Sequence, residues 1–267
     1  MKTSLLCFII PWAGLPMSLH AATLTGSHAL FTGTAALPSA TGSDWAYFTT
    51  NPPVAGAPTN TSSSGSGLFT VSTLGPGATS LLGSGTNIDT FALAFTNGTS
   101  PLSSSGVNVS GIRNNLTGAA AEGNGIRMSL AAQPGPSQIR LWTYLFTADA
   151  TLNVYAYDPS GEDPGTVIHT QSISAGITTT KSAHQFVFDY VPTGTNDALR
   201  FEYVMDTNRR TTANIGFAGI SVTPVPEPGV LPVAAVAVLG CGLLRRRRLE
   251  KHARTSEKHH TEVSAAP

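Results

Sequence analysis

The sequence predicts an all-β fold, an antiparallel β-sandwich of the jelly-roll type, between an N-terminal signal peptide and a single C-terminal transmembrane helix. No segment between Thr23 and Val222 keeps an apolar period of about 3.6 residues over three helical turns. Instead, short runs of alternating apolar and polar residues are interrupted by Gly, Pro, Asn and Ser. The spacing of these runs, roughly 8 to 14 residues, is typical of antiparallel sandwiches.

The first half of this region has the less regular runs. We expect a hairpin in residues 24–37 and a loop in residues 50–67, which are rich in Pro, Ser, Thr and Gly. Aromatic and β-branched residues predict strands at 44–48, 68–74, 91–95 and within 102–116.

The second half alternates clearly. In residues 138–147, Ile139 and Leu141 lie on one face, and Trp142 and Tyr144 lie on the other. Asp-Pro-Ser-Gly at 158–161 and Asp-Pro-Gly at 163–165 predict turns. Strands are therefore expected at residues 125–130, 138–147, 150–156, 167–173, 184–190, 198–205 and 214–222.

The charge of this region excludes one class of partner. Residues 23–223 carry seven Lys and Arg against eleven Asp and Glu, a net charge of −4. The neutrality of the whole chain comes from its basic C-terminal tail. Because nucleic-acid binding requires a basic patch, we expect no nucleic-acid partner.

Cys7 and Cys241 both lie outside residues 23–223, so this region contains no disulfide, thiol nucleophile or Cys-based zinc site.

The N-terminus has the pattern of a secretory signal peptide. Lys2 precedes an apolar run that begins at Leu5, and small residues follow at Ala21 and Ala22. We expect cleavage after Ala21 or Ala22 and export of the region that follows.

The C-terminus combines a proline motif, an apolar run and a basic block. Val225-Pro226-Glu227-Pro228 precedes the uncharged residues 229–244, which would rise roughly 24 Å in a helix. This length is short for a membrane span, which takes about 20 residues. Arg245, Arg246, Arg247 and Arg248 follow, and the positive-inside rule places them in the cytoplasm.

This arrangement resembles the PEP-CTERM sorting signal of exported proteins of Gram-negative bacteria, many of them connected with exopolysaccharide or biofilm. The resemblance covers residues 224–248 and implies recognition by an exosortase, which would cut near Pro226-Glu227-Pro228 and discard the hydrophobic tail. A plain anchor that is never cut is the alternative. The chain continues for 19 residues beyond Arg248, a departure from the usual signal, and we expect this tail to be disordered in the cytoplasm.

The sandwich itself has a weaker resemblance. Asp44-Trp45-Ala46 and the closing strand at 214–218 are similar to secreted bacterial β-sandwich modules with an Asp-Trp-Ala motif. That resemblance implies a fold but no activity. The expected organisation is a signal peptide (1–22), an extracytoplasmic β-sandwich (23–223), the sorting signal with its transmembrane helix (224–248) and a cytoplasmic tail (249–267).

The residues of the predicted sandwich give little support for a catalytic function. His28, His169 and His184 have no zinc-binding spacing, and no nucleophile-elbow motif occurs. Glu202 and Asp189 are a conceivable carboxylate pair for glycoside hydrolysis, although two solvent-facing strand residues are the simpler interpretation. We therefore expect no enzyme activity and no cofactor, with a secreted hydrolase as the least favoured alternative.

Two ligands remain as hypotheses. Asp158, Glu162 and Asp163 form an acidic turn that is a weak calcium candidate without EF-hand spacing, and a plain polar turn is the simpler interpretation. Aromatic side chains on two neighbouring strands offer faces for stacking on sugar rings: Trp142, Tyr144, Tyr155 and Tyr157. Packing in the core between the sheets is the favoured interpretation of these aromatics.

The main functional hypothesis is an exported structural protein of the cell surface or extracellular matrix, held at the inner membrane before processing. A carbohydrate-binding module that contacts extracellular polysaccharide is the alternative. Exposed rings at Trp142 and Tyr155 would favour the alternative.

Overall fold

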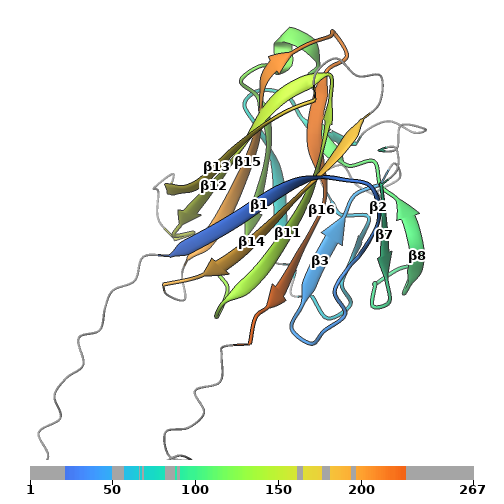
Figure 1. The fold of residues 1–267 in the computed structure, drawn as a ribbon, viewed down its shortest axis with the longest axis vertical. Helices are drawn as coiled ribbons and strands as arrows, with labels where there is room; N and C mark the ends of the chain where they lie inside the picture. The colour runs from blue at the N-terminus through green and yellow to red at the C-terminus, as the bar shows by residue number, and fades with distance from the viewer. Residues whose placement is uncertain are drawn as a thin grey trace, which may run out of the picture. The chain divides into compact units, whose positions relative to one another are not determined.

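The computed structural model describes residues 22–49, 57–65, 67, 69–81, 88, 91–160, 165–175, 181–193 and 197–226. These residues form an all-β, predominantly antiparallel sandwich, as the sequence predicts (Figure 1). Within the described part of the chain, the single helix is a short 3-10 turn at Gly118–Ala121. The strands are β1 (Thr23–Phe31), β2 (Gly33–Ala36), β3 (Asp44–Tyr47), β4 (Asn60–Thr61), β5 (Phe69–Leu74), β6 (Thr79–Leu81), β7 (Phe91–Phe95), β8 (Ser104–Asn108), β9 (Ile112–Asn114), β10 (Gly125–Leu130), β11 (Ser137–Phe146), β12 (Ala148–Tyr157), β13 (Thr166–Ser174), β14 (Ser182–Val191), β15 (Ala198–Asn208) and β16 (Asn214–Pro224).

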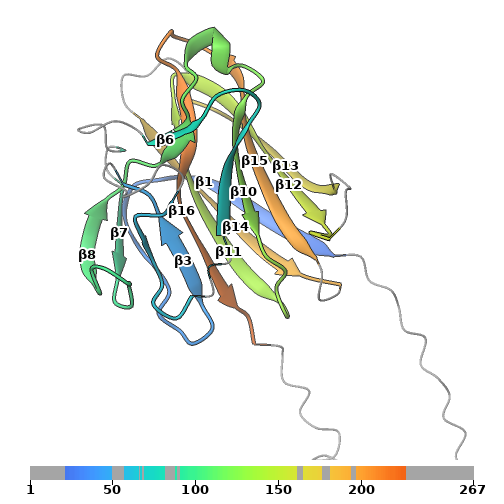
Figure 2. The same ribbon diagram turned by 180° about the vertical axis from the view of Figure 1, so that it is seen from behind.

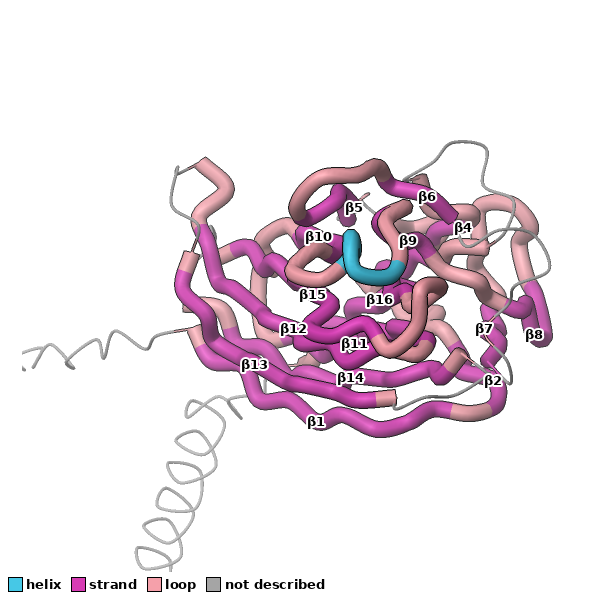
Figure 3. Tube along the Cα trace, turned by 90° about the horizontal axis from the view of Figure 1, so that it is seen from above, coloured by secondary structure: helices cyan, strands magenta, loops and turns pink. Residues whose placement is uncertain are grey.

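Two large sheets form the sandwich. The eight-stranded sheet has the order β1-β14-β11-β16-β3-β4, with β9 and β6 attached beside β16. The five-stranded sheet has the order β13-β12-β15-β10-β5. Seen from above, β13 of the second sheet lies next to β1 of the first (Figure 3).

The main core lies between these two sheets. The eight-stranded sheet contributes Leu141, Phe186 and Phe188, and the five-stranded sheet contributes Leu152 and Phe201, all of them fully buried. Strands β12 and β14 alternate between buried and more accessible residues, which is the pattern of strands with one face in a core. The sandwich predicted from this alternation is confirmed.

A third sheet, which the alternation did not predict, covers part of the other face of the eight-stranded sheet. It consists of β2, β7 and β8, and β2 pairs with β7 in parallel. Phe91 and Leu93 of this sheet pack with Trp45 and Trp142 in a second core. The strands β11 and β16 are therefore buried on both faces along most of their length.

Close packing around β16 requires small residues. A Cβ atom on Gly216 would lie 2.2 Å from the Ile112 carbonyl oxygen and 2.6 Å from Cε1 of Tyr144. The small residues in Asn214-Ile215-Gly216-Phe217-Ala218 thus allow β9 and the Tyr144 ring to approach the strand closely.

The hairpin expected in residues 24–37 is wrong. β1 pairs with β14 in the eight-stranded sheet, whereas β2 pairs with β7 in the third sheet. Gly33, the first residue of β2, has a φ of 99°, a conformation that glycine adopts without strain. The chain therefore changes sheets where the sequence suggests a simple reversal. The region predicted to be a loop also contains a two-residue strand, β4.

The first and last strands meet at one end of the sandwich. The pairings align Leu24 with Tyr190, Tyr190 with Ser137, and Ser137 with Pro224. The start of β1 and the end of β16 consequently lie in one row across the sheet (Figure 1).

Among the described residues, no helix has the length and apolarity to cross a membrane. The apolar run 229–244 predicted to span the membrane lies outside those residues, as do residues 1–21 of the predicted signal peptide.

Candidate functional site

The outer surface of the five-stranded sheet carries the most distinctive group of polar and aromatic side chains. Residues of β10, β12 and β15 that alternate with the core residues point away from the sandwich (strands in Figure 2). We call this surface the tyrosine face and define it by Arg127, Asn153, Tyr155, Tyr157, Val167, Arg200 and Glu202.

The two tyrosines flank one guanidinium group. Tyr155 pairs directly with Arg200 across β12 and β15, and the Arg200 Cζ atom lies 4.5 Å from the Tyr155 ring centroid. The same atom lies 5.6 Å from the Tyr157 ring. Cation–π attraction of this kind holds long side chains in place. On the other side of Tyr155, the paired Val167 is half exposed and extends the apolar part of the face.

A charge cluster lies beside the tyrosines. Arg127 donates two hydrogen bonds to Oε1 of Glu202, from Nε at 3.0 Å and from Nη2 at 2.7 Å. Nε of Arg200 lies 3.0 Å from the same oxygen. Burial, and then the charge of Glu202, raises the pKa of Tyr155, so this hydroxyl stays protonated and able to donate.

An open groove continues from the end of the tyrosine face. Its volume is about 380 Å³, and Tyr157 lies in its wall. The remaining described lining residues are Ala22, Ala156, Asp158, Gly165, Thr166, Ile168, Thr193 and Asp197. This volume falls within the range of small-ligand sites, about 300 to 1,000 Å³.

The groove carries acceptors for hydroxyl groups. Asp158 accepts hydrogen bonds from the backbone and side chain of Ser160, which lower the pKa of its carboxyl. Asp197 accepts a hydrogen bond of 2.7 Å from the Thr193 amide. The carboxylates and threonine hydroxyls provide polar partners beside an aromatic ring, as a sugar requires.

The structure divides the four predicted sugar contacts into two pairs. Tyr155 and Tyr157 are partly accessible on the tyrosine face. Trp142 and Tyr144 are fully buried in the second core, which contradicts the hypothesis that they contact sugar and agrees with the favoured interpretation of core packing. The physical reason is the third sheet, which covers the face of β11 that the sequence pattern left open.

The other candidate groups are not assembled into a site. Glu202 belongs to the five-stranded sheet and Asp189 to the eight-stranded sheet, which contradicts the conceivable catalytic pair. Among the described residues, no three His, Cys, Asp or Glu side chains come close enough to hold a metal. Glu162 and Asp163 of the calcium hypothesis lie outside those residues.

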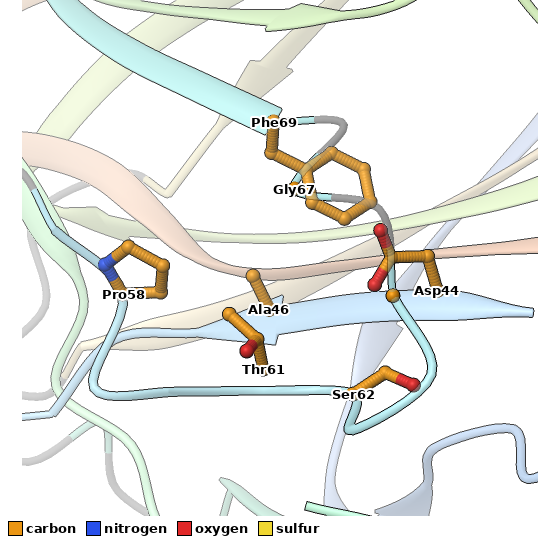
Figure 4. Close-up of a pocket in the computed structure, with 8 residues that line it drawn as sticks. Asp44, Ala46, Pro58, Thr61, Ser62, Gly67 and Phe69 are labelled. Atoms are coloured by element: carbon orange, nitrogen blue, oxygen red, sulfur yellow. The ribbon is translucent and has the colours of Figure 1, made fainter. Parts of the chain in front are cut away.

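The side chains of the Asp-Trp-Ala motif lie on the two opposite sides of β3. Asp44 and Ala46 line a small pocket of about 60 Å³ together with Phe69 of β5 (Figure 4). Trp45 points to the opposite side of β3, where its indole nitrogen donates to Asn97 at 3.0 Å. A pocket of this size has room for about two waters, so a sugar ring does not fit.

The start of the predicted sorting motif directly follows the sandwich. The Val225 amide donates a 2.9 Å hydrogen bond to the Pro136 carbonyl, one residue after β16 ends. Pro226 follows, whereas Glu227, Pro228 and the arginines at 245–248 lie outside the described residues.

No protein-family model matches the chain, and no curated protein matches it in sequence. Among solved structures, the chain is similar to the K3 adhesin domain of Lys-gingipain from Porphyromonas gingivalis, with 13% identity, 48% of this chain and 81% of that one covered, and a TM-score of 0.34. It is also similar to the CBM22-1–GH10 modules of Clostridium thermocellum xylanase 10B, with 13% identity, 57% of this chain covered and a TM-score of 0.31. The match spans 26% of the length of that xylanase structure.

A further similar structure is described as "CBM4 structure and function", with 12% identity, 44% of this chain and 69% of that one covered, and a TM-score of 0.27. At these values the similarities identify no family and assign no ligand to the chain.

Proposed function

We propose that the chain is an exported surface protein whose sandwich binds polysaccharide along the tyrosine face and in the adjoining groove. The observation that supports this most directly is the position of Tyr157, which belongs to both. A sugar chain laid along the face would reach the groove without leaving an aromatic surface.

Each part of this surface has a distinct task in the proposed binding. The Tyr157 ring offers an apolar surface for the C–H face of a sugar. Arg200 keeps the two tyrosine rings in position through its cation–π contacts. Asp158, Asp197 and Thr166 in the groove accept or donate hydrogen bonds to hydroxyl groups. No bond-breaking step is needed for this function.

Replacing Tyr157 with alanine is expected to weaken polysaccharide binding about tenfold, because a lost aromatic contact of about 1.4 kcal/mol corresponds to that factor. Affinity electrophoresis of the full chain in non-ionic detergent, through gels containing different soluble polysaccharides, would measure the change. Tyr157→Phe keeps the ring and should retain most of the binding. Equal retardation of the wild type and Tyr157→Ala by every retarding polymer would contradict the proposed site, and no retardation of the wild type would contradict the proposed function.

We also propose that residues 229–248 hold the precursor in the inner membrane until an exosortase cuts near Pro226-Glu227-Pro228. The adjoining fold supports this arrangement, because both β1 and β16 meet the flanking sequence at the same end of the sandwich. Signal-peptide removal and C-terminal cleavage would then both occur in sequence that adjoins this end of the sandwich.

If an exosortase cuts the chain near the proline motif, the mature protein should lack the basic tail. In a host with an exosortase, intact mass measurement should show loss of the residues beyond the proline motif. A Pro226→Ala, Glu227→Ala, Pro228→Ala variant should stay full length in the membrane fraction, since the motif is lost while β16 is unchanged. A full-length wild-type protein in the same host would show that the segment is a permanent anchor.

A further inference from the structure

The centre of the tyrosine face has more positive than negative charge. Two guanidinium groups, those of Arg127 and Arg200, surround the single carboxylate of Glu202. The nearest other carboxylate along β15 is Asp206, four residues after Glu202, which is roughly 13 Å in an extended strand. That separation exceeds the Debye length of about 8 Å at physiological ionic strength. Among the described residues, the centre therefore groups two guanidinium groups with one carboxylate.

The other described carboxylates near this face lie outside the ion pairs that join Arg127, Arg200 and Glu202. Asp149 lies at the far end of β12 and is paired with Arg209, whose Nη2 and Nε both contact it. Asp158 follows Tyr155 by three residues, roughly 10 Å along the strand, and is held by Ser160. Asp197, which lines the groove, precedes Arg200 by three residues, roughly 10 Å along the chain.

Accessibility differs within the cluster. The Arg127 side chain is 35% exposed, whereas the side chains of Arg200 and Glu202 are 13% and 10% exposed. An arriving ligand would therefore meet the Arg127 guanidinium before the carboxylate. Because Nε and one N–H of Nη2 on Arg127 already donate to Glu202, the remaining N–H groups on Nη1 and Nη2 are the donors left for a ligand carboxylate.

We infer that the tyrosine face selects polysaccharides whose sugars bear a carboxylate, that is, polyuronates, with Arg127 as the contact for the acid group. This inference rests on the proposed carbohydrate-binding function and names its ligand class. The rings of Tyr155 and Tyr157 contact the sugar, and Arg127 contacts its carboxylate. The net charge of −4 on residues 23–223 would repel a polyanion in general, so binding of this kind requires a local site.

The test compares each acidic polymer with a matched neutral form. Alginate and polygalacturonate should retard the full chain in detergent-containing affinity gels, and their carboxyl-reduced derivatives should do so at least tenfold less. Arg127→Ala should lose at least tenfold in affinity for the acidic polymers. Arg127→Lys, which keeps the charge without the fork, should fall between the two. Arg210→Ala, an exposed arginine in the loop before β16, should bind as the wild type does.

The substitution Glu202→Gln should change the affinity for polyuronates in the opposite direction. The amide keeps the shape of the carboxylate and removes its charge, so affinity for polyuronates should rise several-fold. Thermal unfolding of each variant would show that it is folded before its binding is compared.

The outcomes separate this inference from the proposed function. Retention of the neutral derivatives as strong as that of the polyuronates would overturn the inference and leave carbohydrate binding standing. Equal binding of dextran sulfate would also overturn it, because a general polyanion site needs no uronate. A lack of retardation by acidic and neutral polymers alike would overturn both.

Discussion

Trp142→Ala is expected to lower the free energy of unfolding by about 4 kcal/mol, the usual cost of removing a buried aromatic side chain. Trp142 is fully buried in the second core, where its ring lies 6.5 Å from that of Phe91 in the third sheet. The alanine would leave a cavity between two sheets whose backbones are fixed by their own hydrogen bonds. Chemical denaturation of the full chain in detergent, followed by intrinsic fluorescence and circular dichroism, would measure the loss.

The matched control is Trp142→Phe, which keeps an aromatic ring at the same position. It should cost much less, because the Trp142 indole nitrogen has no hydrogen-bond partner among the described residues and only volume is lost. Polysaccharide binding by Trp142→Ala protein that remains folded should match the wild type. A stable Trp142→Ala protein with weakened binding would mean that Trp142 contacts the ligand and that the third sheet does not cover it.

The difference between β11 and β12 shows how far alternation in the sequence can predict a site. Both strands alternate, with three aromatic residues on one face of β11 and two on one face of β12. Alternation identifies two faces but carries no information on whether another element covers the second one. For Trp142 that cover comes from β7 and β8, which lie between 34 and 51 residues earlier in the chain. For Tyr157 no sheet among the described residues covers the face, and the side chain is partly accessible, which differs from the favoured interpretation of core packing.

The charge cluster was missed for a related reason. In the sequence, Glu202 is a strand residue between Phe201 and Tyr203, and nothing local distinguishes it from a solvent-facing acid. Its partner Arg127 is 75 residues away and meets it only through the register of β10 and β15. Register between distant strands depends on the whole sheet. The antiparallel sandwich could thus be predicted from local patterns, whereas the position of the site could not.

The histidine pair between β1 and β14 is a second case in which strand register brings together polar side chains that are distant in the sequence. His28 Nε2 lies 3.0 Å from His184 Nδ1, and His184 Nε2 lies 2.9 Å from the Ser182 hydroxyl. That hydroxyl donates to the Leu145 carbonyl at 3.2 Å, so it must accept from His184. His184 Nδ1 then accepts from His28 Nε2, so both ring nitrogens of His184 have a partner when both rings are neutral.

Protonation of His184 should therefore destabilise the fold. Burial, and then the neighbouring His28, lowers the pKa of His184 to about 4 from an unperturbed 6.5. A folded-state pKa below the unfolded value means that the unfolded chain binds the proton first. Stability is then lost as pH falls from 6.5 to about 4, by about 3 kcal/mol in total. Burial also lowers the pKa of His28 and His169, which adds loss in the same direction.

Urea denaturation of the full chain in detergent at a series of pH values between 7 and 4.5 would measure this dependence. The window avoids the carboxylates of Asp149 and Asp158, whose pKa values are lowered from 3.8 and whose contribution is lost only at more acidic pH. His184→Asn should be less stable than the wild type at pH 7, because the chain of hydrogen bonds is shortened, but its stability should fall less steeply toward pH 4.5. An equally steep fall in both proteins would show that His184 does not carry the pH dependence, and that the loss arises from His28 and His169 at the same edge of the sandwich.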